Sequence, residues 1–170
     1  MQQNISLTQN DKTMVTKEQV AEAQKLWGDG VVKIGSLKDS RDECVSYTSS
    51  FLDDRYAFES ETVLFKPTKC KFEQFRATKA EALSYFIAGE ERACQEDGGF
   101  AINPWTNVRF ENTGIILEEG RAIAMGNYYF TDLEGNEAKV EYTFGYKLTN
   151  GVLKIDVHHS SFPYNPTPLA

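Results

Sequence analysis

The residues best suited to chemistry lie together near the C-terminus, in the segment LKIDVHHSS at residues 153–161. His158 and His159, the 2 histidines of the chain, are followed directly by Ser160 and Ser161. Imidazole and hydroxyl groups can move protons, bind metal ions or hydrogen-bond an oxyanion. The apolar start of the segment predicts a strand that begins in a core and ends in a polar pocket. The alternative is an ordinary half-buried strand whose polar end is exposed.

These histidines do not form a zinc site by themselves. Successive side chains of a strand point to opposite faces, so His158 and His159 cannot both face one cavity. A catalytic zinc takes three protein ligands and a structural zinc takes four. The 3 cysteines are widely spaced and form no CxxC motif, which indicates neither a zinc knuckle nor a disulfide framework. We therefore predict no bound metal and no cofactor, while a Mg²⁺ or Mn²⁺ ion held by carboxylates stays open.

The residues favour hydroxyl chemistry over a serine hydrolase. His158 and Ser160 lie two positions apart on one strand and point in parallel, whereas a catalytic triad needs its nucleophile and base to face each other. No GxSxG, GxGxxG or GxxxxGK[ST] motif occurs. Hydroxyls from Thr68, Tyr85, Ser160 and Ser161 could instead line one cavity and hydrogen-bond a small oxyanion. Each also has an ordinary structural explanation, such as a strand end or a buried tyrosine.

Length and composition indicate one acidic globular domain. The 170 residues are enough to bury a core. The net charge is −7 and no basic stripe is present, which argues against nucleic acids and anionic membranes as partners. No apolar run reaches the roughly 18 residues of a membrane span, and no signal peptide is visible. An odd number of cysteines adds to the expectation of a cytoplasmic protein with reduced thiols.

Helical patterns occupy the N-terminal half of the chain. Thr16 and Gln19 have the spacing of a capping box, and a helical apolar stripe follows over residues 16–34. Gly28 and Gly30 lie inside this stripe and predict a kink or close packing there. Two further helices are expected, over about residues 41–52, capped by Ser40, and over about residues 78–95.

Strand patterns dominate after residue 100 and follow one short strand at residues 62–65. Four long strands are expected, over about residues 101–112, 115 or 120 to 130, 137–148 and 152–162. Helices followed by an antiparallel meander indicate an α+β fold. Long twisted strands that curve around helices produce a cone with one cavity, which is the default binding site. The expected organisation is a polar arm (1–15), a cone-shaped domain (16–164) and a proline-rich tail (165–170).

Several segments resemble known proteins with a cone fold. The segment VLFKPT before a helix, and a last strand ending in His-x-Ser, resemble the association domain of calcium/calmodulin-dependent protein kinase II, a nuclear transport factor 2-like fold. The chain is more closely similar to the iota class of carbonic anhydrases, in the segments FKPT, SYF, NPWTNVRFEN, MGNYYFTD, VEYTFGYK and IDVHHSSFPY. This resemblance covers roughly residues 16–164, and HHSS with a following proline is its most specific part.

The resemblance implies reversible hydration of CO₂ to bicarbonate and a proton. Some iota-class proteins need no metal and others are linked to manganese; the histidine count independently disfavours zinc here. The resemblance also implies a homodimer or larger assembly built through the sheet.

Carried over to this sequence, the resemblance assigns bicarbonate and the attacking water to the hydroxyls of Thr68, Tyr85 and Ser160. If Ser160 points into the cavity, His158 shares its face and becomes the proton acceptor or shuttle. If Ser161 points inward instead, His159 takes that role. We predict the Ser160 face, with Ser161 as a further substrate-binding residue. An apolar wall for CO₂ is expected from Phe86, Phe110 and Tyr142.

Two other functions stay open at this point. A non-catalytic association module would oligomerise and bind a peptide or small anion in the cone. A cone-fold isomerase or dehydratase would place an Asp–His or Asp–Tyr pair in its cavity, and Asp156 shares the predicted face of His158. A CO₂ hydration assay distinguishes the carbonic anhydrase from the association module. A cavity that holds a large apolar ligand would favour the isomerase or dehydratase.

Overall fold

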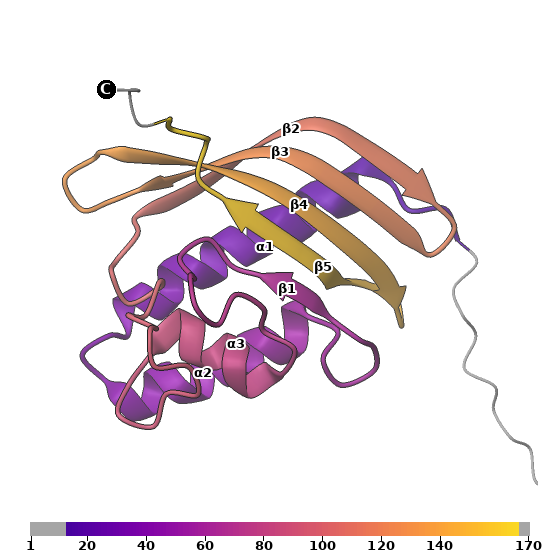
Figure 1. The fold of residues 1–170 in the computed structure, drawn as a ribbon. Coiled ribbons are helices and arrows are strands. Elements are labelled where there is room, and N and C mark those ends of the chain that lie inside the picture. Colours follow the sequence, from indigo (N-terminus) through magenta and orange to yellow (C-terminus); the bar gives the residue numbers. More distant parts are fainter. Residues whose placement is uncertain (1–12, 167–170) are drawn as a thin grey trace, which may run out of the picture.

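A curved five-stranded sheet has three helices packed on one of its faces (Figure 1). This computed structural model describes residues 13–166. The elements are α1 (Lys17–Ser36), α2 (Arg41–Arg55), β1 (Leu64–Lys66), α3 (Lys79–Ile87), β2 (Asn107–Glu118), β3 (Arg121–Thr131), β4 (Glu137–Thr149) and β5 (Val152–Ser161). The strand order is β1-β5-β4-β3-β2, with β1 parallel to β5 and the other pairs antiparallel. The predicted α+β fold is confirmed, and the open sheet curves around the helices like part of a cone.

The predicted arm and tail fall largely outside the described residues, which exclude residues 1–12 and 167–170. The described end of the arm lies against the sheet, because Met14 forms an isolated bridge with Glu119 and Val15 is buried. Between residues 13 and 166, no helix is long and apolar enough to cross a membrane.

Local signals in the first helix are confirmed. The Thr16 amide donates to Gln19 Oε1 at 2.9 Å, and the Gln19 amide donates to Thr16 Oγ1 at 3.2 Å, which completes the capping box. At Gly30, a Cβ would lie only 2.4 Å from the Phe51 ring, so this glycine lets α1 pack closely on α2. Ser40 occupies the predicted N-cap position of the second helix, but its side chain makes no capping hydrogen bond.

Two predicted elements have different bounds in the structure. The helix predicted over residues 78–95 is too long, because α3 ends at Ile87, where Ala88 and Gly89 adopt positive φ angles of 44° and 112°. These angles turn the chain out of the helix. The strand predicted over residues 101–112 is misplaced: β2 begins later and continues to the turn that joins it to β3.

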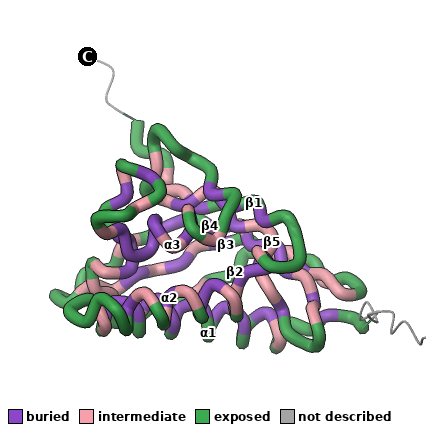
Figure 2. The backbone as a smooth tube through the Cα atoms, turned by 90° about the horizontal axis from the view of Figure 1, so that it is seen from below, coloured by how far each residue is buried: buried purple, intermediate pink, exposed green. Residues whose placement is uncertain are grey.

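The core lies between the helices and the inner face of the sheet, where Figure 2 shows buried residues on facing elements. At its centre, the Trp27 side chain on α1 is 1% exposed. Its indole packs against rings from α3 and four strands, namely Phe86, Phe110, Tyr128, Phe130, Phe144 and His158. One tryptophan thus links the first helix to the strand that carries the polar residues.

Candidate active site

A β-bulge brings His158 and Ser160 to the inner face of the sheet. The pairing of β5 with β4 skips Asp156, because consecutive residues of β4 pair with Val157 and Ile155. An extra residue shifts the alternation of side chains by one position. Ile155 and His158 therefore both point into the core, with 2% and 3% exposure, and Ser160 follows them at 1%.

Four hydroxyl groups meet at the inner end of β5. Ser160 Oγ lies 2.5 Å from Thr68 Oγ1 and 2.5 Å from the Tyr128 hydroxyl. The Tyr85 hydroxyl, supplied by α3, accepts a hydrogen bond from the Lys69 amide at 3.3 Å and lies beside Thr68. The structure thus brings together the three hydroxyls predicted from the sequence and adds a fourth from β3.

The short edge strand β1 carries Thr68 to this position. β1 runs parallel to the end of β5, with Lys66 opposite His159. The Lys66 ammonium also donates to the Ser160 carbonyl at 2.9 Å, which holds the two strands together beyond their ladder. Pro67 then ends β1, since proline lacks the N–H that a ladder needs. The next residue, Thr68, lies over the Ser160 side chain.

Three of these hydroxyls, those of Thr68, Tyr85 and Tyr128, border a small cavity between β1, α3 and the sheet, and Ser160 lies behind them. Its volume is about 10 Å³, close to the minimum that admits one water molecule. The lining combines polar groups with aromatic walls and consists of Trp27, Pro67, Thr68, Tyr85, Phe86, Phe100, Tyr128 and His158. A substrate larger than water must therefore separate hydroxyls that bond one another.

Both tyrosines of the cavity are neutral at neutral pH. Burial raises the pKa of Tyr85 and of Tyr128 far above the usual value for a phenol. The hydrogen bond between the Lys69 amide and Tyr85, and the hydrogen bonds of Tyr128 with Ser160 and Thr68, act in the opposite direction but are weaker. The site is therefore a group of neutral hydroxyl donors.

His158 is held in the interior through both nitrogens of its ring. Nδ1 lies 2.8 Å from the Tyr56 hydroxyl, and Nε2 lies 3.3 Å from the Tyr128 hydroxyl. Burial, and to a smaller extent the nearby positive charges of His159 and Lys66, lowers the pKa of His158 well below its usual value of 6.5. The imidazole is therefore neutral at neutral pH.

This low pKa predicts a loss of stability in mild acid. The unfolded chain binds a proton at His158 near pH 6.5, whereas the folded chain does so only at lower pH. Between these two pH values the unfolded state holds more protons, so the free energy of unfolding falls as the pH drops below about 6.5, by up to about 1.4 kcal/mol per pH unit. Urea unfolding from pH 7.5 to 5.5 measures this slope.

Matched histidine variants test the assignment of that slope. His158→Asn removes the titrating group. We expect the free energy of unfolding of this variant to change less with pH, whatever its value at pH 7.5. His159→Gln removes the exposed neighbour and is expected to keep the pH dependence, since His159 is exposed on the outer face. A slope that disappears in His159→Gln and persists in His158→Asn would contradict the prediction.

The cavity does not offer the ligands that metal ions prefer. Among residues 13–166, no three His, Cys, Asp or Glu side chains gather where they could hold an ion. Of the described side chains that line the cavity, none is a carboxylate, and the one imidazole is bonded to tyrosines on both sides. Zinc needs imidazole or thiolate ligands and manganese needs oxygen ligands such as carboxylates, so this set of donors fits neither ion.

Four residues predicted to act on substrate do not line the cavity. Ser160 lies behind the lining, where its hydroxyl bonds Thr68 and Tyr128. Ser161 lies beyond Ser160 on the other face of β5, where its hydroxyl donates to Glu141 at 3.0 Å. Phe110 and Tyr142 belong to the core around the cavity but not to its lining. Of the predicted apolar wall, Phe86 is the residue that reaches the cavity.

Several residues of the site are missed by the sequence interpretation: Tyr128, Tyr56, Trp27 and Phe100. Tyr128 had a partial signal in the aromatic run YYF, which is typical of a strand, and the structure places Tyr128 on the buried side of β3. A buried tyrosine needs a partner for its hydroxyl, which makes such a residue a candidate for any polar cavity. Tyr56 had no comparable signal, since it precedes an irregular loop between α2 and β1.

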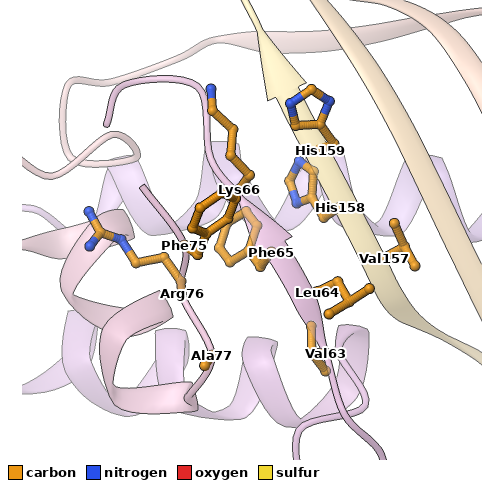
Figure 3. Close-up of a pocket in the computed structure, with 10 residues that line it drawn as sticks. All are labelled: Val63, Leu64, Phe65, Lys66, Phe75, Arg76, Ala77, Val157, His158 and His159. Carbon is orange, nitrogen blue, oxygen red and sulfur yellow. The ribbon is translucent and has the colours of Figure 1, made fainter. Parts of the chain in front are cut away.

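A second, larger pocket lies at the open edge of β1 (Figure 3). Its volume is about 340 Å³, and its walls come from β1, the end of β5 and residues 75–77. His158 borders both this pocket and the small cavity. The imidazole therefore lies between the four clustered hydroxyls and the larger pocket at the edge of the domain.

The fold and the cavity define the class of protein. A curved sheet around three helices with one polar cavity is the nuclear transport factor 2-like architecture. A protein from Xanthomonas campestris, named as a calcium/calmodulin-dependent protein kinase II association domain, has this fold with a TM-score of 0.60 and 21% identity over 88% of this chain and 89% of its own. A nuclear transport factor 2-like protein from Streptomyces avermitilis, named as a dehydratase, gives a TM-score of 0.55 at 14% identity over 87% and 96%.

Within this class, the chain belongs to the metal-independent carbonic anhydrase family, whose sequence model matches residues 18–162. The metal-independent carbonic anhydrase of Nostoc sp. (strain PCC 7120) is 37% identical over 154 residues, which are 88% of this chain and 75% of the relative. The crystal structure of a cyanobacterial iota-carbonic anhydrase in complex with bicarbonate superposes with a TM-score of 0.84 at 35% identity, covering 89% of this chain and 94% of that one. The predicted family is therefore confirmed.

Proposed function

We propose that the small cavity is the site at which this chain hydrates CO₂ reversibly to bicarbonate without a metal ion. The observation that carries the proposal is the convergence of the Thr68, Tyr85 and Tyr128 hydroxyls on one enclosed space, with Ser160 bonded to Thr68 and Tyr128 from behind the lining. Bicarbonate is a small planar oxyanion, and neutral hydroxyl donors suit its oxygens. A similar protein of known structure was crystallised with bicarbonate.

The chemical step joins a water oxygen to the carbon of CO₂ and releases one proton. The cavity hydroxyls contribute by orienting CO₂ and water and by donating hydrogen bonds to the negative charge that develops on the oxygens. They do not lower the pKa of water in the way a zinc ion does. The aromatic walls formed by Trp27, Phe86 and Phe100 exclude bulk water and so strengthen these hydrogen bonds.

Metal removal tests this proposal directly. Purified protein treated with excess EDTA is expected to keep its full rate of CO₂ hydration, because the cavity lining supplies hydroxyls rather than metal ligands. A stopped-flow assay with a pH indicator measures the rate before and after treatment. Addition of Zn²⁺, Mn²⁺ or Mg²⁺ to the treated protein serves as the control and is expected to give no increase.

Two outcomes would contradict the proposal in different ways. A rate that is lost with EDTA and restored by one ion would show that the chain depends on that ion. Absence of any hydration by folded protein, with or without metal, would show that the cavity does not catalyse this reaction.

Assembly and location are also proposed from exposed apolar side chains and free thiols. A homodimer or larger homo-oligomer formed through the outer face of the sheet is supported by the apolar side chains of Ile116 and Met125, which are 57% and 56% exposed. A cytoplasmic location is supported by the free thiols of Cys44, Cys70 and Cys94.

A further inference from the structure

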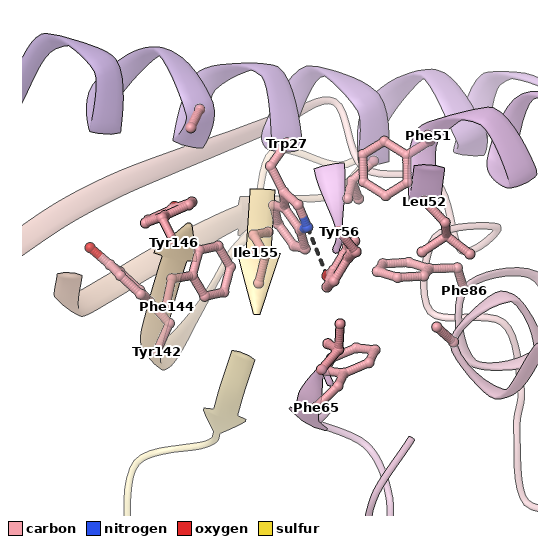
Figure 4. Packing of buried hydrophobic residues seen from close by; sticks show 14 of the residues in the cluster. Trp27, Phe51, Leu52, Tyr56, Phe65, Phe86, Tyr142, Phe144, Tyr146 and Ile155 are labelled. Atoms are coloured by element: carbon pink, nitrogen blue, oxygen red, sulfur yellow. Dashed lines mark hydrogen bonds between the residues drawn. The ribbon is translucent and has the colours of Figure 1, made fainter. Parts of the chain in front are cut away.

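A row of hydrogen bonds leads from the first helix to the cavity. The Trp27 Nε1 group on α1 lies 3.0 Å from the Tyr56 hydroxyl, a contact drawn as a dashed line in Figure 4. Tyr56 in turn lies 2.8 Å from His158 Nδ1. Tyr56 is 1% exposed, and its hydrogen-bond partners Trp27 and His158 are also buried. The hydroxyl proton of Tyr56 therefore needs an acceptor within the protein.

Counting donors fixes the direction of these bonds. The indole N–H is a donor only, so Tyr56 accepts from Trp27. Within residues 13–166, the Tyr56 hydroxyl has two hydrogen-bond partners, Trp27 and His158. If His158 donated from Nδ1, the Tyr56 proton would be buried without an acceptor, at a cost of about 1–3 kcal/mol. Tyr56 therefore donates to Nδ1, which carries no proton.

We infer that His158 carries its proton on Nε2, and that Tyr56, oriented by Trp27, is the positioning residue that holds this tautomer. The Nε2–H group then faces the Tyr128 hydroxyl at 3.3 Å and donates to it. This inference rests on the proposed function for its catalytic meaning but not for its structural content.

The same counting of donors and acceptors applies to the clustered hydroxyls of the cavity. Tyr128 accepts from His158, so it donates its own proton to Ser160 across 2.5 Å. Ser160 then donates to Thr68, also at 2.5 Å. The chain of donors ends at the Thr68 hydroxyl, which lines the cavity beside Tyr85, so an entering oxyanion competes with Tyr85 for the Thr68 proton. A bicarbonate oxygen there meets a donor whose oxygen already accepts a hydrogen bond, and such bonds strengthen one another.

This order of protons changes the role expected for His158. The sequence predicted a proton acceptor or shuttle, yet a protonated Nε2 cannot accept the proton that water loses during hydration. His158 instead acts as the oriented donor that polarises Tyr128, Ser160 and Thr68. Burial supports this role, because it lowers the pKa of His158 and keeps the ring neutral.

Nitrogen NMR of the whole protein labelled with ¹⁵N-histidine tests the tautomer. With 2 histidines in the chain, a His159→Gln variant assigns the His158 ring by elimination. The ring nitrogen that couples to both carbon-bound ring protons is Nε2, and we expect it to carry the proton in the wild-type protein at pH 7.5. A protonated Nδ1 in the wild-type protein overturns the inference, regardless of any measurement of activity.

The variant Tyr56→Phe tests the positioning role. It removes the donor to Nδ1 and is expected to shift the His158 resonances towards a mixture of tautomers, with a kcat for CO₂ hydration about tenfold lower and a KM within about twofold. The control is Tyr146→Phe, because the Tyr146 hydroxyl is also buried and has no hydrogen-bond partner among the described residues. It should leave both the resonances and kcat unchanged.

The readouts separate this inference from the proposed function. Unaltered His158 resonances in Tyr56→Phe overturn the role of Tyr56, even if its activity falls. The expected resonances in a protein that hydrates no CO₂ would support the tautomer and refute the function.

Discussion

Replacing Ser160 by alanine is expected to lower kcat for CO₂ hydration by about 10²–10³-fold, the loss typical of disabling one preorganised donor of an oxyanion site, because Ser160 orients the Thr68 and Tyr128 hydroxyls that line the cavity. Ser160 connects the clustered hydroxyls, since its Oγ bonds both Thr68 and Tyr128 at 2.5 Å. Without it, the donors on either side lose their shared partner and their orientation. Stopped-flow hydration at several CO₂ concentrations measures kcat and KM separately.

Ser161→Ala is the matched control, because it deletes the same atom one residue further along the strand. Its hydroxyl bonds Glu141 rather than the cavity group. We expect its activity to stay within about twofold of the wild type, since surface substitutions of this kind have small effects. Thermal unfolding of both variants checks that each is folded. Equal rates for Ser160→Ala and the wild type would refute the assignment of the site.

A double variant tests whether the hydroxyls act as one unit. When catalytic groups act as a unit, removing one of them already removes most of the rate enhancement of all. Thr68→Ala combined with Ser160→Ala should therefore be no slower than the slower single variant. Losses that multiply would mean that each hydroxyl contacts substrate independently of the other.

Much of the fold could be predicted because its signals are local. The capping box of Thr16 and Gln19 and the alternation of β4 depend on residues close in sequence. The end of α3 could not be predicted in this way. Its last carbonyls, those of Ile87 and Ala88, accept hydrogen bonds from the Arg41 guanidinium on α2 at 2.8 and 2.6 Å. This partner, distant in sequence, satisfies carbonyls that the end of the helix leaves without an internal donor.

The inward face of β5 shows the same limit within the site. Strict alternation from the apolar Leu153 and Ile155 would turn His159 inward, and the bulge at Asp156 turns His158 inward instead. A signal for the bulge did exist on the neighbouring strand. Gly145 interrupts the alternation of β4, and a Cβ there would lie 2.9 Å from Val157. An isolated glycine in a strand pattern is typical of a bulge, but which strand it shifts depends on the pairing.

The hydrogen-bond partners of His158 were beyond prediction for a related reason. Tyr56, Tyr128 and Trp27 come from a loop, a strand and a helix that are far apart in sequence. Their residue types are ordinary for a core, and only their convergence gives them a polar role. The sequence therefore indicated which groups could act on substrate, whereas the order of protons among them required the structure.

A buried ion pair next to the site is expected to have the largest effect on stability. Arg76 Nη2 lies 2.7 Å from Asp97 Oδ1, and both side chains are 0% exposed. The other oxygen of Asp97 accepts from Ser84 at 2.6 Å, directly before Tyr85 on α3. The Arg76 amide donates to the Phe65 carbonyl of β1 at 2.8 Å. The pair thus joins the two segments that carry the Tyr85 and Thr68 hydroxyls.

Asp97→Asn is expected to lower the free energy of unfolding by about 3–5 kcal/mol, because it leaves the Arg76 charge buried without a counterion. Two nitrogens of this guanidinium, Nε and Nη1, already have no hydrogen-bond partner among residues 13–166, so Arg76 has little else to compensate its charge. Urea unfolding at pH 7.5 measures the loss. Asp29→Asn, which breaks the exposed pair with Lys25, is the control and should cost far less.

The double variant Arg76→Met with Asp97→Asn distinguishes an unpaired charge from a damaged fold. It removes the charge and keeps an acceptor for Ser84, so it should recover at least half of the stability lost in Asp97→Asn. The recovered stability should return activity with it, since the pair positions Tyr85 and Thr68 without touching substrate. A double variant less stable than Asp97→Asn would mean that Arg76 stabilises the fold by packing, and that its charge is compensated elsewhere.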